Sequence, residues 1–297
     1  MSPGRRRFVD GLRVNSIVLV VLLIITGMVL HATNSVLHMD GLFFGLFLFL
    51  FGLLVIAARI VRSRILVLIC QGLIFFLAAG YCAGFSALAA LRVGAPLSDA
   101  QLDGWDHWFG LHTERVIVFF ASFDVFNHVW GVVYNLTVPG IILTIFILGL
   151  RKDEVSLYRL CFIFSVGSMT CSLFNLFFPA IGTVLYHGVS PDIMRRFPVG
   201  AGVYFKGPFE AYHSGRLPGI SPAALSGVVS FPSFHVVMAL MTLFFLRGNR
   251  LVNGMVFVDV VLVLLSTILV GGHYFADVAG GAVLFFGLFF LSRRVVQ

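Results

Sequence analysis

Eight long apolar runs constrain this chain more than any other feature of its sequence. A helix that crosses the hydrocarbon core of a bilayer needs about 20 mostly apolar residues, and each run comes close to that length. The runs occupy approximately residues 15–33, 41–58, 65–91, 128–150, 160–179, 229–246, 251–270 and 274–292. With 59% hydrophobic residues, the chain cannot be a water-soluble globule. We therefore predict an all-α fold, a polytopic transmembrane helical bundle of about eight spans.

Basic residues are distributed unevenly between the runs. Fourteen Lys or Arg residues precede the first run, follow the second, fourth or sixth, or end the chain, whereas six lie in the other connections. The positive-inside rule assigns the richer side to the cytoplasm. We expect a multi-pass protein of a bacterial inner membrane, with both termini in the cytoplasm. The charge also suits contact with anionic membrane lipids, while no long basic run or zinc-finger spacing indicates a nucleic-acid partner.

Two of the non-cytoplasmic connections are too long to be simple turns. Residues 93–127 combine two tryptophans with several acidic residues, which is typical of a helix lying at the membrane interface. Residues 180–228 form the longest polar stretch, and loops of that length are often functional. We accordingly divide the chain into an N-terminal three-span region (1–92), an interfacial helical segment between spans three and four (93–127) and a C-terminal helical core (128–297).

Two short motifs place polar residues at the non-cytoplasmic ends of spans. In SFPSFH, Ser233 and His235 fall in the first turn of the sixth span, where free backbone N–H groups and the helix dipole favour an anion. In GGHYFADVAGG, His273 lies in the turn before the eighth span, and Asp277 follows four residues later on the same helix face. We expect both histidines at one membrane depth, although 38 residues separate them.

This combination of side chains suits covalent phosphoryl transfer. A carboxylate that holds an imidazole in one tautomer lets the free ring nitrogen attack phosphorus, while a second histidine donates a proton to the leaving oxygen. Helix N-terminal N–H groups and the Ser233 hydroxyl would hold the phosphoryl oxygens. We expect neither a metal ion nor another cofactor.

The two motifs resemble the second and third signatures of the type 2 phosphatidic acid phosphatase superfamily. They are most similar to its inositol phosphorylceramide synthase-like (inositolphosphotransferase) branch, and the resemblance covers approximately residues 115–292. It implies a metal-independent enzyme in which His273 is the nucleophile, Asp277 orients it and His235 is the general acid. The implied substrate is a lipid phosphate. Water as acceptor makes a phosphoric ester hydrolase and an alcohol acceptor makes a phosphotransferase, and the sequence leaves both open.

The three cations of the family pattern are missing from their expected positions. The counterpart of the first signature, K-x6-R-P, is CSLFNLFFP, which has Cys171 and Phe178 in place of the cations. Thr267 stands where the third signature has an arginine. We expect a cation of the long loop to neutralise the phosphate instead, and Arg216 is our first candidate because a guanidinium group can bind phosphate bidentately.

Other functions stay open at this point. The missing cations also suit a non-catalytic relative that binds lipid, and polar residues at one mouth of a bundle suit a transporter, although transporter sites often lie near the midplane. A metal site made of His235, His273 and Asp277 fits known ligand spacings less well. The sequence identifies neither the lipid nor the oligomeric state.

Overall fold

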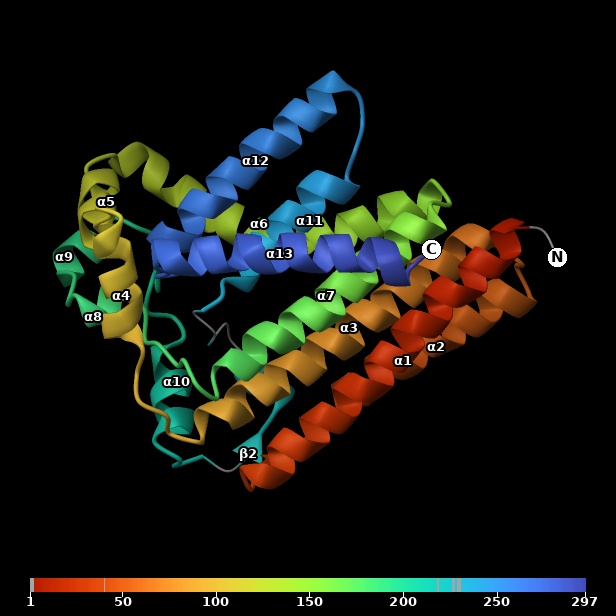
Figure 1. The fold of residues 1–297 in the computed structure, drawn as a ribbon, viewed down its shortest axis with the longest axis horizontal. Helices are drawn as coiled ribbons and strands as arrows, with labels where there is room; N and C mark the ends of the chain where they lie inside the picture. The colour runs from red at the N-terminus through yellow and green to blue at the C-terminus, as the bar shows by residue number, and fades with distance from the viewer. Residues whose placement is uncertain (1–2, 40, 218, 226–227, 229–230) are drawn as a thin grey trace.

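The protein is a bundle of long apolar helices capped at one end by short helices (Figure 1). The computed structural model describes residues 3–39, 41–217, 219–225, 228 and 231–297. Among these residues, six helices contain stretches that are long and apolar enough to cross a membrane. They are α1 (Pro3–Ala32), α3 (Arg64–Leu91), α6 (Asp124–Leu150), α7 (Glu154–Phe174), α12 (Arg250–Leu269) and α13 (Phe275–Val295).

Two further apolar helices are shorter, α2 (Gly41–Arg59) and α11 (Phe234–Phe245). The eight predicted spans correspond to these two helices and the six longer ones. The predicted all-α, multi-pass helical bundle is therefore confirmed, although α11, with 12 residues, is shorter than the usual length of a span.

Helix α11 differs most from its predicted span. It begins at Phe234 rather than at residue 229, because Ser233 takes the extended N-cap conformation with φ −68° and ψ 115°. Residues 229 and 230, where the span was predicted to begin, lie outside the described residues. With twelve residues at about 1.5 Å each, α11 covers about 18 Å, which is less than the thickness of a bilayer core. The polar N-terminus of α11 thus lies inside the stretch that the sequence assigned to the span.

Helix α7 lies in the middle of the bundle. It packs against α1 and α3 on one side and against α11 and α13 on the other (Figure 1). Gly167 allows the second contact, since a Cβ there would meet the side chains of Leu288, Phe234 and Val237 within 3.5 Å. The largest group of buried apolar side chains lies along these helix faces, so the core is continuous from the N-terminal helices to the C-terminal ones.

Four short helices close one end of the bundle, and we call them the collar. They are α4 (Asp99–Trp108), α5 (Thr113–Ala121), α8 (Thr183–Tyr186) and α9 (Pro191–Met194). The predicted interfacial segment thus contains two helices, because Gly110 adopts a φ of +71° directly after α4. Beside the collar lie α10 (Lys206–His213), a 3-10 turn (Pro222–Ala224) and a parallel pair of two-residue strands, β1 (Val36–Leu37) and β2 (Gly219–Ile220).

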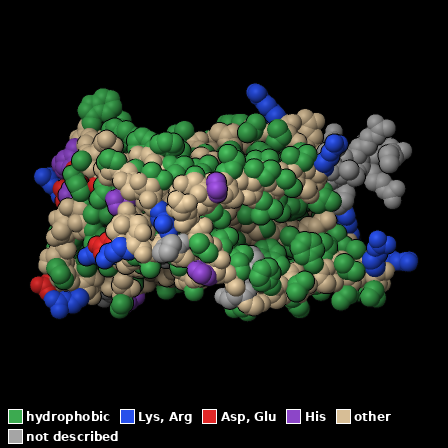
Figure 2. Space-filling view, turned by 90° about the horizontal axis from the view of Figure 1, so that it is seen from below, with side chains coloured by type: hydrophobic (Ala, Val, Ile, Leu, Met, Phe, Trp, Pro, Cys, Tyr) green, Lys and Arg blue, Asp and Glu red, His purple; other side chains and the backbone are tan. Residues whose placement is uncertain are grey.

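The collar and the chain termini lie at opposite ends of the molecule (Figure 1). On the face drawn in Figure 2, a broad hydrophobic band separates an end with Lys and Arg side chains from an end where acidic, basic and histidine side chains gather. This is the arrangement that the predicted topology requires of a multi-pass membrane protein. Which end faces the cytoplasm stays a prediction.

Candidate active site

His273 lies in the tight turn between α12 and α13. Gly272 has a φ of +72°, which L side chains rarely adopt, and a Cβ on Gly271 would meet the Thr267 carbonyl oxygen at 2.5 Å. The Thr183 N–H donates to the Gly272 carbonyl at 2.9 Å, and the His273 N–H donates to the Thr267 carbonyl at 3.2 Å. The turn therefore fixes the backbone of His273, which is only 4% exposed.

Asp277 both starts helix α13 and orients His273. Tyr274 is the N-cap residue of the helix, and its N–H donates to Asp277 Oδ2 at 2.9 Å, as in a capping box. The same oxygen lies 3.1 Å from His273 Nδ1, and Asp277 is fully buried. An ionised Asp277 keeps the imidazole proton on Nδ1 and leaves a lone pair on Nε2.

Ser233 lies next to that free nitrogen. Its hydroxyl oxygen is 3.4 Å from His273 Nε2, and its side chain makes no capping hydrogen bond to α11. The Ser233 N–H donates to the Asp277 carbonyl at 3.0 Å, which ties the start of α11 to the start of α13. Because the hydroxyl faces the imidazole, the first N–H groups of α11 are not capped by it and can bind an anion.

His235 faces His273 across a short gap. The two ring centroids are 6.4 Å apart, with an angle of 59° between the rings. Tyr134 of α6 stacks on His235 with ring centroids 4.1 Å apart, and its hydroxyl lies 3.3 Å from His235 Nδ1 and 3.0 Å from the Tyr204 hydroxyl. These contacts occupy Nδ1 of His235 and leave Nε2 to exchange a proton with a ligand.

Both histidines and both tyrosines line one cavity of about 240 Å³. The rest of its wall is small or apolar. It consists of Gly80, Ala83, Gly84 and Ala87 of α3, Phe164, Ser168, Cys171 and Ser172 of α7, and Leu225, Val228 and Phe234. A mostly apolar wall with a few convergent polar groups is typical of a site for an organic ligand.

The cavity wall contains no Lys or Arg among the residues that the structure describes. Cys171 does line the cavity, so the position at which the first family signature has its lysine faces the site. Thr267 is buried, and its hydroxyl donates to the Leu264 carbonyl at 2.7 Å. Two of the positions that carry cations in the family pattern are thus filled here by Cys171, which lines the cavity, and by Thr267, which bonds within its own helix.

Arg216, the predicted phosphate-binding cation, is exposed and is not part of the cavity wall. Its Nε donates to the Ser214 hydroxyl at 2.8 Å. Lys206 of the same long loop is half exposed and lies 3.9 Å from Glu210. The structure therefore brings Ser233, His235, His273 and Asp277 together, whereas Arg216 lies apart from them.

Asp99, the first residue of α4, is 2% exposed and holds the turn around His273 in place. Its Oδ1 accepts hydrogen bonds from the Gly182 N–H and the Tyr274 hydroxyl, both at 2.9 Å. Its Oδ2 accepts one from the Ile181 N–H at 3.0 Å. Burial raises the pKa of the Asp99 carboxyl, and the three donors oppose that rise. The carboxylate connects the collar to the N-cap of α13.

Asp106, near the end of α4, caps helix α13 directly. Its Oδ1 accepts from the Ala276 N–H at 2.8 Å, and its Oδ2 accepts from the Phe275 N–H at 2.9 Å and from the Thr113 hydroxyl at 2.7 Å. Burial raises the pKa of Asp106 too, against the effect of these donors. A carboxylate at a helix N-terminus satisfies free N–H groups and favours the dipole. Helix α4 thus holds the turn of α13 that carries Asp277.

Sequence reasoning overlooked four of these residues. Asp99 and Asp106 lie seven positions apart on one helix face, so their spacing was a usable signal for a shared partner. Tyr134 contacts His235 from a separate helix, and Tyr204 of the long loop contacts the Tyr134 hydroxyl. No local motif marks either tyrosine.

Comparison with known protein families gives one match, to the PAP2 superfamily over residues 100–291. The matched segment runs from the start of α4 almost to the end of α13, so it includes His235, His273 and Asp277 but not α1 to α3. Curated proteins and solved structures give no match. Because the family match covers more than half of the 297 residues, the chain belongs to the PAP2 superfamily.

Proposed function

We propose that the protein is an integral-membrane lipid phosphate phosphatase or phosphotransferase that works through a phosphohistidine intermediate. Membership of the PAP2 superfamily supports the reaction class. The observation that carries the mechanism is the contact of His273 with Asp277 through Nδ1, at 3.1 Å, with the His235 ring 6.4 Å away on the same cavity. Nucleophile, orienting carboxylate and proton donor are then all present.

In the first step, Nε2 of His273 attacks the phosphorus atom of the substrate. An N–P bond forms while the P–O bond to the lipid breaks, and the leaving oxygen takes a proton from Nε2 of His235. Asp277 stabilises the positive charge that develops on the His273 ring. The N-terminal N–H groups of α11 and the Ser233 hydroxyl stabilise the phosphoryl oxygens.

In the second step, an acceptor attacks the phosphohistidine. His235 takes a proton from the acceptor oxygen as the new O–P bond forms and the N–P bond breaks, which restores both imidazoles. Water gives a phosphatase and an alcohol gives a phosphotransferase. The resemblance to the inositol phosphorylceramide synthase-like branch favours transfer.

Arg216 remains our candidate for the cation that neutralises the phosphate. Its side chain is exposed, and its hydrogen bond to the Ser214 hydroxyl is exposed too, so it can turn toward a bound substrate without breaking a buried contact. A guanidinium group would then replace the cations that the family pattern places at positions 171, 178 and 267.

The same proposal places the active site in the periplasm of a bacterial inner membrane. The distribution of basic residues supports cytoplasmic termini, and the collar lies at the other end of the molecule (Figure 1). His273 and His235 lie at helix N-termini on the collar side. A lipid would enter from the outer leaflet, with its headgroup among the polar residues and its chain along the apolar wall.

A second candidate function is that of a relative that binds lipid without turning it over, or that of a transporter. One observation favours it: no Lys or Arg lines the cavity in the described part of the chain. The two functions differ in what His273 does, since a carrier or binder does not need a nucleophile.

The test is turnover of a panel of phospholipids, polyprenyl phosphates and lipid A by purified protein in lipid nanodiscs. Released phosphate and product masses are measured with and without added alcohols. We expect His273→Gln to lower turnover by at least about 10³-fold, and Asp277→Asn and His235→Gln to lower it strongly as well. Alcohol-dependent loss of free phosphate would identify a transferase.

The matched control is His128→Gln, because His128 lies exposed on α6 away from the cavity wall. It should keep wild-type turnover. If His273→Gln keeps wild-type turnover, the proposed mechanism is wrong. If the wild type binds lipid phosphates but turns none of them over, non-catalytic binding replaces the enzymatic function.

A further inference from the structure

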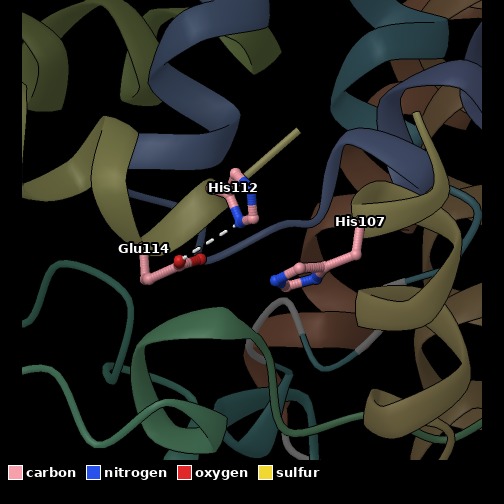
Figure 3. A group of neighbouring side chains, drawn as sticks. All are labelled: His107, His112 and Glu114. Atoms are coloured by element: carbon pink, nitrogen blue, oxygen red, sulfur yellow. Dashed lines mark ion pairs between the residues drawn. The ribbon is translucent and has the colours of Figure 1, made fainter. Parts of the chain in front are cut away.

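A second cluster of chemically active side chains lies in the collar, outside the cavity. His107 is near the end of α4, His112 precedes α5, and Glu114 belongs to the first turn of α5. Potential ligand atoms of these three residues all lie within 4.8 Å of one another. Figure 3 shows the side chains of His107, His112 and Glu114 facing one another, with His112 and Glu114 joined by an ion-pair contact.

The contacts of His107 leave one of its ring nitrogens free. Its Nδ1 lies 2.9 Å from the Asp103 carbonyl oxygen and 3.3 Å from the Asp103 carboxylate. These acceptors hold the proton on Nδ1, so Nε2 carries a lone pair. Histidines that bind metal ions commonly donate their other N–H to a carbonyl or carboxylate in this way.

The other two residues have polar atoms without a hydrogen-bond partner. His112 Nδ1 and Glu114 Oε2 are buried atoms that make no hydrogen bond within the described part of the chain. Their nearest charged neighbours lie beyond hydrogen-bond distance. His112 Nδ1 is 3.6 Å from Glu114 Oε1, and Glu114 Oε2 is 3.9 Å from His187 Nε2. The Arg115 guanidinium, itself 75% exposed, is 3.9 Å from Glu114 Oε1. Buried polar atoms normally have a partner, and an exception needs an explanation.

A neighbouring triad, Asp103, Glu114 and His187, is a weaker candidate. Its ligand atoms also lie within 4.8 Å of one another, but His187 Nε2 already bonds to Asp103 Oδ1 at 2.8 Å. An ion there would have to break a satisfied hydrogen bond, whereas an ion beside His112 would satisfy atoms that have none.

We propose that His107, His112 and Glu114 bind one divalent transition-metal ion of the zinc class. Two imidazoles and a carboxylate are a ligand set that zinc accepts, with a water molecule in the fourth position. Ligand atoms around a tetrahedral zinc ion lie about 3.3 Å apart, so the three side chains need to move inward by about an ångström. Their side chains are 28% to 39% exposed, which leaves an entry path for the ion.

The ion would join α4 to α5 at the point where the chain turns between them. Helix α4 also carries Asp99 and Asp106, whose carboxylates hold the start of α13. Binding would therefore stiffen the collar that supports the active site, without a role for the ion in the reaction. An ion that binds the folded protein more tightly than the unfolded chain raises the melting temperature.

The experiment uses the full chain without a histidine tag, because a tag would itself bind the probe. Protein treated with a chelator and then freed of it is titrated with Zn²⁺ by calorimetry, and Co²⁺ is added separately to record its visible absorption. We expect one Zn²⁺ per chain, intense Co²⁺ absorption bands of a four-coordinate site, and a higher melting temperature with Zn²⁺. The variant His107→Gln/His112→Gln should bind at least about tenfold more weakly and lose the rise in melting temperature.

His31→Gln is the matched control, since His31 is an exposed histidine of α1 outside the collar; it should bind Zn²⁺ like the wild type. The Co²⁺ spectrum of the wild type tests the site even if the double variant does not fold. Wild-type protein that binds no Zn²⁺, or a folded double variant that binds it unchanged, overturns the proposal. Loss of binding in His187→Gln but not in the double variant would place the ion in the other triad and overturn the assignment.

Discussion

At the scale of single residues, the two imidazoles of the site are held by different kinds of partner. His273 is held by a buried carboxylate four residues away on its own chain segment. His235 is held by an aromatic ring and a hydroxyl from another helix. In the proposed reaction, the carboxylate stabilises the positive charge that His273 gains when it attacks phosphorus. The Tyr134 hydroxyl oxygen can accept Nδ1–H of a doubly protonated His235, so that Nε2–H is the proton that this ring passes on. The partners therefore suit the proposed roles.

The role of Tyr134 can be tested by separating its ring from its hydroxyl. We expect Tyr134→Phe to lower turnover about fivefold, because it keeps the stacked ring and removes the hydroxyl, whose contact with His235 Nδ1 is worth about 1 kcal/mol. The hydroxyl contact with Tyr204 is lost as well. Tyr134→Ala should lower turnover by about a further tenfold, since the stacked ring is lost as well. Steady-state kinetics across a range of pH measures both effects.

Tyr186→Phe serves as the control, because Tyr186 is 41% exposed and lies outside the cavity wall. A merely structural role for Tyr134 would lower the melting temperature and leave the shape of the pH profile unchanged. Equal turnover in Tyr134→Ala and the wild type would remove Tyr134 from the site.

The sequence predicts local contacts of the site far better than distant ones. His273 and Asp277 are four residues apart, so the N-cap of α13 and its first turn are enough to keep them close. Tyr134 and His235 are 101 residues apart in the chain, and their contact depends on how α6 packs against α11. The same reasoning explains why Arg216 lies away from the cavity. Its charge suits a phosphate, but no short spacing to a motif residue fixes where its side chain lies.

At the scale of elements, the collar helix α4 caps the N-terminus of α13, a helix far from it in the chain. Asp106 accepts two N–H groups from the first turn of α13, and Asp99 accepts the hydroxyl of its N-cap residue, Tyr274. Both carboxylates are buried. The position of Asp277 thus depends on a helix more than 160 residues earlier, which no local pattern reveals.

Asp106→Asn tests this cap. The amide can accept fewer of the three donors and turns an N–H group toward another, so we expect a loss of about 1–3 kcal/mol of stability. Turnover should fall by about tenfold or more, because a displacement of the first turn of α13 misplaces His273. Thermal unfolding in detergent and steady-state kinetics measure the two effects.

Asp192→Asn is the control for Asp106→Asn, since the Asp192 side chain is 79% exposed on the collar. It should change neither quantity. A folded Asp106→Asn protein with wild-type turnover would show that the collar does not position the reacting histidine.

Helix α3 forms the apolar wall of the cavity, and Gly80 tests whether that wall holds a lipid chain. A Cβ at Gly80 would meet only the Phe164 ring, at 3.9 Å, so Gly80→Ala should be tolerated. Gly80→Leu should extend into the cavity and raise KM several-fold for a long-chain lipid phosphate. It should leave hydrolysis of a short soluble phosphate ester nearly unchanged.

Gly27→Leu is the matched control for that substitution, because a Cβ at Gly27 has no neighbour within 4 Å and α1 does not line the cavity. If Gly80→Leu affects long and short substrates equally, the wall does not select for the chain of the lipid.

At the scale of the whole molecule, the cavity is lined by residues from a longer part of the chain than the family match covers. The match begins at residue 100, yet Gly80, Ala83, Gly84 and Ala87 of α3 line the cavity. The histidines of the proposed mechanism therefore come from the part that matches the superfamily, and one wall comes from the N-terminal part outside it. The sequence did not reveal that α3 lines the cavity. If the substrate is a lipid phosphate, as proposed, this wall is placed to discriminate between lipids.

Hydropathy predicts the bundle because the bilayer requires long apolar helices, but it does not place their ends. The start of α11 at Phe234 and the break between α4 and α5 both depend on single residues, Ser233 and Gly110, whose backbone conformations end or begin a helix. The sequence therefore predicts which segments are apolar helices, and tertiary packing determines where their polar ends meet.

The orientation of the bundle is the last prediction, and the buried native cysteines make it measurable. All four, at positions 70, 82, 161 and 171, are buried, so the wild type should react little with a membrane-impermeant maleimide. Asp192→Cys marks the collar and Arg294→Cys marks the end with the termini. The positive-inside rule predicts that the end with the excess of basic residues faces the cytoplasm, so we expect intact spheroplasts to label position 192 and not position 294. Permeabilised membranes should label both. Labelling of position 294 alone in intact spheroplasts would invert the topology and move the site to the cytoplasmic face.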